Sequence, residues 1–254
     1  MPSSNLLVRK LESFHTLAKE DRDLLERLSR PVREIEAKQD MIKEGDVPDK
    51  VFLILSGFAC RYKMIGGGKR QIMAFLVPGD FCDFQVFILQ EMDHNIGTLS
   101  KCHVVELARD TILELTERPA IARAFWWASL VDAAVLREWL VNMGQRTAEE
   151  RIAHLLCELL MRLEAVGLVR DNTYSLPITQ IDLADTMGMT NVHANRMLTR
   201  LRDDGLIEID AKELVVKDVG RLKAFSGFDP NYLHIRGGKT AFSGGGGIAD
   251  LLPP

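Results

Sequence analysis

The segment 178–206 constrains the fold of this chain most, because its residues predict two helices joined by a tight turn. Thr179 is a good N-cap for the first helix, and Asp182 stands where the acidic partner of a capping box belongs. Gly188 supplies the turn, since glycine adopts a positive φ without steric cost. Thr190 then caps a second helix. The segment should therefore form a helix-turn-helix hairpin.

Each predicted helix has one apolar side at helical spacing, which should face the core. These apolar residues are Ile181, Leu183, Ala184 and Met187 in the first helix, and Ala194, Met197, Leu198 and Leu201 in the second. The outer side of the second helix carries Asn191, Val192, Asn195, Arg196 and Thr199, flanked by His193, Arg200 and Arg202. Residues 190–202 hold three arginines and no carboxylate, although the whole chain has a net charge of −4. A locally cationic helix on an acidic protein is typical of a DNA-reading element.

A helix pair with a glycine turn is also common as a plain packing unit. The residues that follow it favour DNA binding, because 206–210 and 214–217 predict two short strands joined by a tight turn. Helix, turn, helix and hairpin together make a winged helix-turn-helix.

Composition limits the remaining possibilities. The 254 residues are 46% hydrophobic and 27% charged, which fits a soluble protein of about two domains. A pI near 5.9 argues against a general nucleic-acid coat and for localised basic contact. The cysteines (Cys60, Cys82, Cys102 and Cys157) include no CxxC pair, so we expect no zinc knuckle or redox pair and a reducing, cytoplasmic setting. Neither a signal peptide at the N-terminus nor an apolar run of about 20 residues is present.

The chain divides into segments of different pattern. Leucines at helical spacing predict short helices within 1–30, and short β-rich runs with turns between them predict a sandwich or barrel over 31–118. Gly66 to Gly68 should form a hairpin tip. We assign 145–225 to the winged helix-turn-helix domain and 226–254 to a flexible glycine-rich tail.

Pro119 opens a long helical stretch over 119–144 that has apolar residues on more than one face. A surface helix does not need so much apolar surface, so we expect burial on two sides. One side would pack on the β domain and the other on the same helix of a second subunit. The alternative is burial within a single chain.

Three motifs, together with this order of segments, resemble the Crp/Fnr family of bacterial transcription regulators over about residues 5 to 225. The motifs are Lys43 to Asp46 (KEGD), Pro78 to Phe81 (PGDF), and Thr179 to Leu206. The resemblance implies an α+β fold with a double-stranded, jelly-roll-like β-roll of the cyclic-nucleotide-binding type, a dimerisation helix and a winged helix-turn-helix. It also implies that a ligand in the roll reorients the DNA-binding domains about a hinge, here Asn142 to Gln145, with Gly144 as pivot.

Two of the family's effectors are disfavoured by the sequence. Relatives that bind cyclic AMP hold its phosphate with an arginine soon after the PGDF motif, but here no Arg or Lys occurs between Phe81 and Ser100, and Asp83, Glu91 and Asp93 add negative charge. The hydroxyl residues with which those relatives hold the base on the long helix are replaced by Leu136 and Arg137. The iron–sulfur relatives use cysteines near the N-terminus, and none precedes Cys60 here.

Several residues remain as an effector pocket implied by the resemblance: Met73, Phe81, Cys82, Phe84, Phe87, Leu136 and Arg137. We expect an apolar region that either binds a small apolar effector or is collapsed. We predict no cofactor and no metal; haem, with His94, His103, Cys82 or Met73 as axial donor, is the open alternative. A thiol switch at Cys82 would need a lowered pKa, which Asp83 opposes.

By family correspondence the base-reading residues are Asn191, Val192, Asn195 and Arg196. The resemblance implies that Arg196 contacts guanine, while Val192 stands where many relatives have glutamate and is suited to a thymine methyl group. Either asparagine is suited to adenine. His193, Arg200 and Arg202 are candidates for phosphate contacts. A homodimer would read an inverted repeat with half-sites about one helical turn apart.

The sequence therefore predicts a DNA-binding transcription regulator and no enzyme. A cupin-like metalloenzyme is a remote alternative, because the roll region has only His94 and His103 and lacks a His-x-His motif. A second alternative is a dimeric regulator that needs no effector. RNA polymerase is a possible partner, although no local pattern marks a surface for it.

Overall fold

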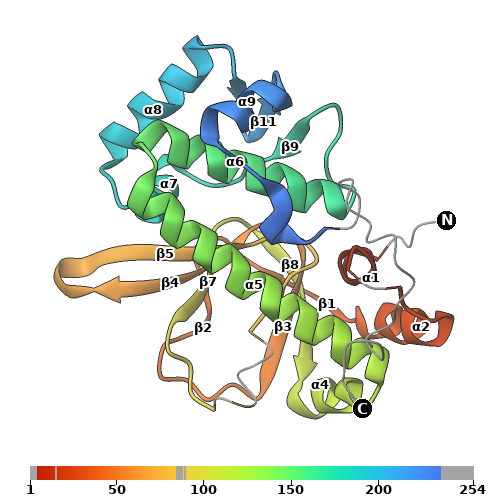
Figure 1. Ribbon diagram of the computed structural model, residues 1–254. Coiled ribbons are helices and arrows are strands. Elements are labelled where there is room, and N and C mark those ends of the chain that lie inside the picture. The colour runs from red at the N-terminus through yellow and green to blue at the C-terminus, as the bar shows by residue number, and fades with distance from the viewer. Residues whose placement is uncertain (1–4, 15, 84–87, 89, 236–254) are drawn as a thin grey trace, which may run out of the picture.

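The protein was analysed as a computed structural model that describes residues 5–14, 16–83, 88 and 90–235. A β-sheet domain and a helical domain lie at opposite ends of the molecule, and one long helix, α5 (Pro119–Gln145), passes across both (Figure 1). The N-terminal helices α1 (Leu6–Glu12) and α2 (Lys19–Leu28) lie beside the β-sheet domain near the start of α5. Asn5 begins α1 by accepting a hydrogen bond from the N–H of Val8.

The β-sheet domain consists of two antiparallel four-stranded sheets, as the sandwich or barrel prediction requires. The first sheet contains, in spatial order, β1 (Val32–Ile35), β8 (Cys102–Ala108), β3 (Lys50–Ser56) and β6 (Phe81–Cys82). The second contains β2 (Asp40–Ile42), β7 (Asn95–Thr98), β4 (Ala59–Ile65) and β5 (Lys69–Leu76). Gly66 to Gly68 form the tip of the β4–β5 hairpin, as predicted. Fully buried Leu53, Ile96 and Val105 belong to the core of this domain.

Helix α4 (Arg109–Thr116) leads into α5, which begins with Pro119 in its first turn. One side of α5 is buried through Phe125, Val135 and Trp139. The opposite side is exposed within this chain: Leu140 is 75% exposed and Trp126 69%. The expectation of burial on two sides is therefore met on one side only. By length and composition α5 is also the one candidate membrane span among the described residues, a criterion that core helices of soluble proteins meet as well.

The helical domain begins with α6 (Ala148–Ala165) and contains the predicted helix-turn-helix and hairpin. Its further elements are β9 (Thr173–Ser175), α7 (Gln180–Met187), α8 (Asn191–Asp203), β10 (Ile207–Asp210), β11 (Glu213–Val216) and α9 (Val219–Ser226). The strands form one antiparallel sheet in the order β10-β11-β9. Thr179 and Asp182 form the capping box of α7, Gly188 ends it at φ +61°, and Thr190 caps α8.

Three expectations about local structure need correction. Ile181 is 57% exposed, because only Leu183, Ala184 and Met187 of α7 face the core. Helix α5 continues through Gly144 to Gln145, so the break before α6 comes at residues 146–147, just after the predicted hinge.

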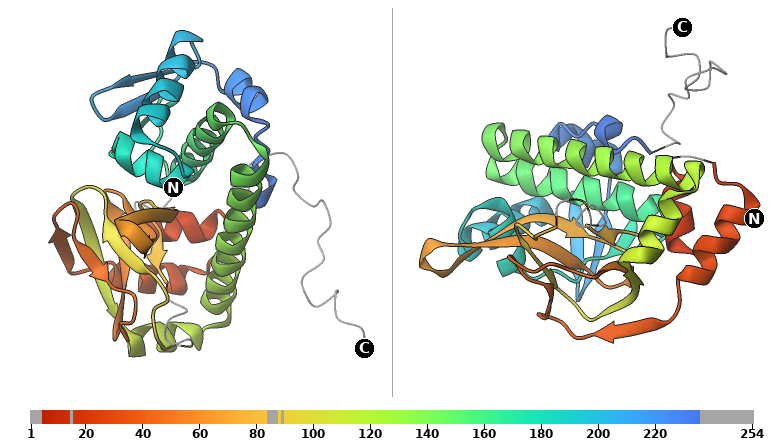
Figure 2. Two further views of the ribbon diagram at one scale, coloured as in Figure 1. Left: turned by 90° about the vertical axis from the view of Figure 1, so that its left-hand side faces the viewer. Right: turned by 90° about the horizontal axis from the view of Figure 1, so that it is seen from below.

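The third correction concerns the predicted flexible tail, which begins too early at residue 226. After α9, a short 3₁₀ helix, η2 (Pro230–Leu233), buries Tyr232 and Leu233 against α5 and α6. The aromatic and aliphatic side chains of this segment supply apolar surface that a glycine-rich composition lacks. Residues 236–254 lie outside the described residues. Figure 2 shows the last described segment beside the long helix.

Candidate nucleic-acid interface and effector cavity

Helix α8 presents its predicted DNA-reading side to solvent. Ala194, Met197, Leu198 and Leu201 are buried, as predicted, which fixes the orientation of the helix. The opposite residues are exposed (Asn191, Val192, Asn195, Arg196, Thr199, Arg200 and Arg202), with His193 partly buried. Val192, at 81%, is the most exposed large apolar residue of the described chain. In Figure 1, α8 lies at the end of the molecule remote from the β-sheet domain.

Three polar contacts hold side chains on this side of α8. Gln180, at the start of α7, donates from Nε2 to Oδ1 of Asn195 over 3.1 Å. Arg196 Nη2 lies 2.8 Å from Nδ1 of His193, one helical turn earlier. Arg200, predicted to contact phosphate, forms an ion pair with Glu149 of α6. An arginine on the predicted DNA-reading side is thus paired with a carboxylate outside the helix-turn-helix.

The helix-turn-helix is docked on the β4–β5 hairpin of its own chain. Arg70 of β5 forms ion pairs with Asp182 at 2.5 Å and with Asp185 at 2.8 Å. Gln71 donates to the carbonyl oxygen of Thr186 over 3.1 Å. These contacts connect the two domains, and the T-shaped pair of Phe75 and Trp139 joins β5 to α5 beside them.

Asp80, in the PGDF motif, is a second connection between distant elements. It is buried and forms ion pairs with Lys10 of α1 and, at 2.7 Å, with Arg162 of α6. Burial alone would raise the pKa of Asp80, but the charges of Lys10 and Arg162 and a hydrogen bond from Val77 N–H outweigh it, so that the pKa is lowered.

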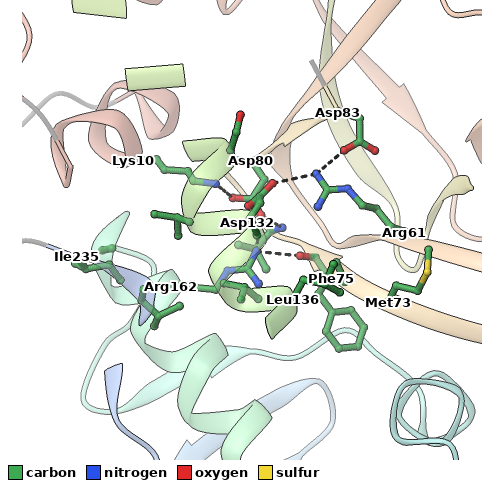
Figure 3. A pocket seen from close by; sticks show the side chains of 18 of the residues that line it. Lys10, Arg61, Met73, Phe75, Asp80, Asp83, Asp132, Leu136, Arg162 and Ile235 are labelled. Atoms are coloured by element: carbon green, nitrogen blue, oxygen red, sulfur yellow. Dashed lines mark hydrogen bonds and ion pairs between the residues drawn. The ribbon is translucent and has the colours of Figure 1, made fainter. Parts of the chain in front are cut away.

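A cavity of about 370 Å³ lies between the roll, α1, α5 and α6 (Figure 3). Its apolar wall includes Met73, Phe75 and Leu136, and Leu233 and Ile235 of the C-terminal segment contribute to it. A cavity of this size is within the range of small-molecule sites.

The polar wall of the cavity is built around Arg61 of β4. Arg61 was not among the residues predicted from the sequence. Its Nη2 atom lies 2.8 Å from Asp83 and 3.2 Å from Asp132 of α5. Burial alone would lower the pKa of Arg61, but the two carboxylates raise it. Both ring nitrogens of His94 face carboxylate oxygens, Nε2 at 2.7 Å from Asp83 and Nδ1 at 2.6 Å from Asp93. The expected apolar region therefore contains an ion-pair network.

The predicted pocket residues do not all meet at this cavity. Met73 and Leu136 line it, whereas Phe81, Cys82 and Arg137 do not. Phe81 instead packs edge-on against Phe125, with ring centroids 5.5 Å apart. Phe84 and Phe87 lie outside the described residues.

The candidate haem and thiol residues are engaged in other contacts. Both ring nitrogens of His94 face carboxylates, and His103 is paired with Ser56 and Glu34. Cys82 is fully buried, and burial followed by the charge of Asp83 raises its pKa well above the ordinary value. In the described ranges, no group of three or more His, Cys, Asp or Glu is arranged for a metal ion.

A buried polar cluster joins α5, α6 and the C-terminal segment near the hinge. Glu158 accepts hydrogen bonds from Trp139 at 2.9 Å and from Tyr232 at 3.0 Å, and it pairs with Arg162. Burial raises the pKa of Glu158 despite these partners. Arg146, at the end of α5, donates to the carbonyl oxygen of Ser226. No local sequence signal marks the contacts of Glu158 with Trp139 and Tyr232 or of Arg146 with Ser226, because these partners are far apart in the chain.

Comparison with known proteins agrees with this geometry. A sequence profile of the cyclic nucleotide-binding domain matches residues 32–118, and one of the Crp-like helix-turn-helix domain matches residues 150–225. The transcriptional activatory protein AadR of Rhodopseudomonas palustris is 30% identical over 224 residues, which cover 86% of this chain and 90% of AadR. The chain belongs to the Crp/Fnr family.

Other members support the same assignment. The transcriptional activator protein FnrL of Cereibacter sphaeroides is 28% identical over 202 residues, 78% of this chain and 81% of FnrL. The solved structure of FixK2 from Bradyrhizobium japonicum shares the fold, with a TM-score of 0.67 and 21% identity over 77% of this chain and 96% of FixK2. These relatives are transcription regulators and not enzymes, which removes the cupin-like alternative. This Crp/Fnr protein is a DNA-binding transcription regulator.

Proposed function

We propose that this Crp/Fnr regulator acts as a homodimer that reads an inverted repeat through α8, in response to a small effector bound in the cavity. The observation that carries the proposal is the exposed outer side of α8 over residues 191–202, which has arginines and amides but no carboxylate. The N-terminal part of such a helix enters the major groove, where Arg196 is suited to guanine and Val192 to a thymine methyl group.

Selection from a random DNA duplex pool by the purified, ligand-free protein tests the DNA-binding part. When cell extract is added as an effector source, enrichment of a two-fold inverted repeat at about physiological salt is the expected result, and salt must be stated because it controls affinity. Enrichment without any added molecule would support the effector-independent alternative. No enrichment, even with cell extract as an effector source, would contradict sequence-specific binding.

Replacing Arg196 with alanine tests its role. We expect specific affinity to fall by about 1–3 kcal/mol while non-specific affinity stays nearly constant. Arg33 is an exposed arginine on β1, so Arg33→Ala is the matched control and should change neither the specific nor the non-specific affinity for DNA. An equal loss on all sequences would show that Arg196 contacts only phosphate.

The exposed apolar side of α5 is proposed to pack on the same helix of a second copy. Trp126, Leu130, Leu140 and Val141 lie on it and are about half exposed or more. Contiguous apolar surface of this kind usually marks an interface. Sedimentation should find a dimer that Leu140→Glu dissociates, whereas Leu113→Glu on α4 does not. A monomeric wild type, or a dimer that both variants retain, would contradict this interface.

The effector proposal rests on the cavity and its walls. Asp80, Asp83, Asp93 and Asp132 contribute carboxylates there, and the cations Lys10, Arg61 and Arg162 are each paired with at least one of them, so a phosphodiester meets no unpaired cation among these three. We expect cyclic AMP to leave the unfolding temperature unchanged and small apolar compounds to raise it, since a ligand that binds only the folded state stabilises it. A rise with cyclic AMP would overturn the expected ligand class.

The names of FnrL and AadR describe activators, so we propose that this protein also activates transcription, in the cytoplasm and by contact with RNA polymerase. Transcription in vitro from a promoter that carries the selected repeat tests this. Lower transcript yield on adding the protein would indicate repression instead.

A further inference from the structure

The polar contacts on α8 involve the side chains that the proposed function assigns to base reading. We propose that Gln180 and His193 are positioning residues that determine the base preference of α8, Gln180 by presenting Asn195 as a hydrogen-bond donor and His193 by anchoring Arg196. This inference rests on α8 being the recognition helix.

Gln180 fixes the direction of the Asn195 amide. Its Nε2 donates to Oδ1 of Asn195 over 3.1 Å, so the oxygen already has a partner and the Nδ2 group is the free end. In the major groove, guanine N7 and O6 and thymine O4 are acceptors, whereas cytosine N4 and adenine N6 are donors. Asn195 should therefore favour guanine or thymine and disfavour cytosine. A two-point contact with adenine is weakened, because only the second lone pair of Oδ1 remains to accept from adenine N6.

His193 anchors Arg196 in a way that leaves a fork for the base. A guanidinium has only donors, so the Nδ1 atom 2.8 Å from Arg196 Nη2 is the acceptor of this contact. Arg196 Nη2 carries a second hydrogen, which still forms a two-donor edge with Nη1 or Nε for N7 and O6 of guanine. A free arginine side chain has high rotamer entropy, so a guanidinium that is already held in the unbound protein loses less conformational entropy when it contacts the base.

Neither contact is explained by folding. Gln180, Asn195 and Arg196 are exposed, and α7 and α8 already have capping residues and a buried apolar side. Hydrogen bonds between exposed side chains contribute little to stability because water replaces them. The Gln180–Asn195 contact instead connects α7 with α8, and the His193–Arg196 contact lies within α8, both on the side proposed to face DNA.

Gln180→Glu gives the sharpest test. Glutamate can only accept, so it requires Asn195 to donate from Nδ2 and frees Oδ1 for the base. Selection should show one half-site position changing from guanine or thymine to cytosine or adenine, by roughly tenfold in relative affinity. Gln180→Ala should broaden the preference at that position. Gln90→Glu, an exposed glutamine of the roll, is the matched control and should leave every position unchanged.

His193 is tested with two substitutions. His193→Ala should lower discrimination for guanine at the Arg196 position by roughly tenfold. His193→Gln keeps an acceptor and should restore it to within about twofold. A merely structural role would lower the affinity for every sequence equally, and alanine and glutamine would then behave alike. Thermal unfolding of each variant should match the wild type.

The outcomes separate this inference from the proposed function. If the wild type selects an inverted repeat and Arg196→Ala alters it, but the Gln180 and His193 variants keep the wild-type preference at every position, positioning is refuted and the DNA-reading assignment stands. If the wild type selects no repeat, or Arg196→Ala changes no base preference, both fail. Altered preference confined to one position in each variant supports the inference.

Discussion

Replacing Asp80 with alanine should destabilise the whole protein, because this carboxylate connects three distant elements. It is buried, pairs with Lys10 of α1 and Arg162 of α6, and accepts from Val77 N–H at 2.9 Å. Removing one partner of a buried ion pair costs about 3–5 kcal/mol. Arg162 keeps Glu158 at 3.1 Å, and Lys10 is 20% exposed and can reach water. We therefore expect the lower end, about 3 kcal/mol.

For a chain of this size that loss corresponds to a fall of about 6–12 °C in Tm. Thermal unfolding at neutral pH, followed by circular dichroism, measures it. Because the pKa of Asp80 is lowered, its charge-dependent contribution is fully present above 3.8, the ordinary aspartate value, and is lost as pH falls through the lower folded-state pKa. The difference between wild type and Asp80→Ala should thus be constant from neutral pH down to about pH 5 and shrink only in strong acid.

Glu34→Ala is the control for Asp80, since Glu34 pairs with Lys101 at the surface and its loss should not move Tm measurably. A fall in Tm of less than about 2 °C for Asp80→Ala would refute the reasoning. It would show that water replaces the lost carboxylate at Lys10 and Arg162.

Three further predictions follow from other contacts. Burial and the charge of Arg146 lower the pKa of His154 to about 4, so between pH 6.5 and about 4 the imidazole is protonated in the unfolded chain but not in the folded one, and the free energy of unfolding should fall as pH drops through this range. His154→Gln should make the free energy of unfolding, measured with urea, less dependent on pH in this range, and an unchanged dependence would contradict the prediction. Gly57→Ala should cost more than about 1 kcal/mol by denaturant unfolding, because φ is +80° and a Cβ would lie 2.2 Å from the Lys101 carbonyl oxygen; wild-type stability would rule out the clash. Arg70→Ala should speed amide hydrogen exchange in α7 but not in β3, since it removes the ion pairs that dock α7 on the roll. Exchange in α7 at the wild-type rate would show that apolar contacts hold α7 in place.

Local chemistry made the DNA-binding domain predictable from sequence. The caps Thr179 and Thr190, the turn at Gly188 and the apolar spacing of α8 all act within a few residues of one another. The strand-and-turn pattern likewise predicted a sandwich or barrel, and the motifs that resemble the family implied the β-roll. Exposure was less predictable: Ile181 fits the apolar pattern of α7, yet it faces solvent, because packing against α6 and α8 decides which side of a short helix is covered.

The sequence by itself determined the elements, their order and the family, since hydrophobic period, caps and turns are local properties of the chain. Only the tertiary structure decided which charges meet. Arg61 of β4 pairs with Asp83, which follows β6, and with Asp132 of α5. Tyr232 of the C-terminal segment donates a hydrogen bond to Glu158 of α6. Such contacts depend on how sheets and helices pack, and side chains far apart in the chain carry no local signal of their partners. The cavity and its ion-pair network therefore became visible only in three dimensions.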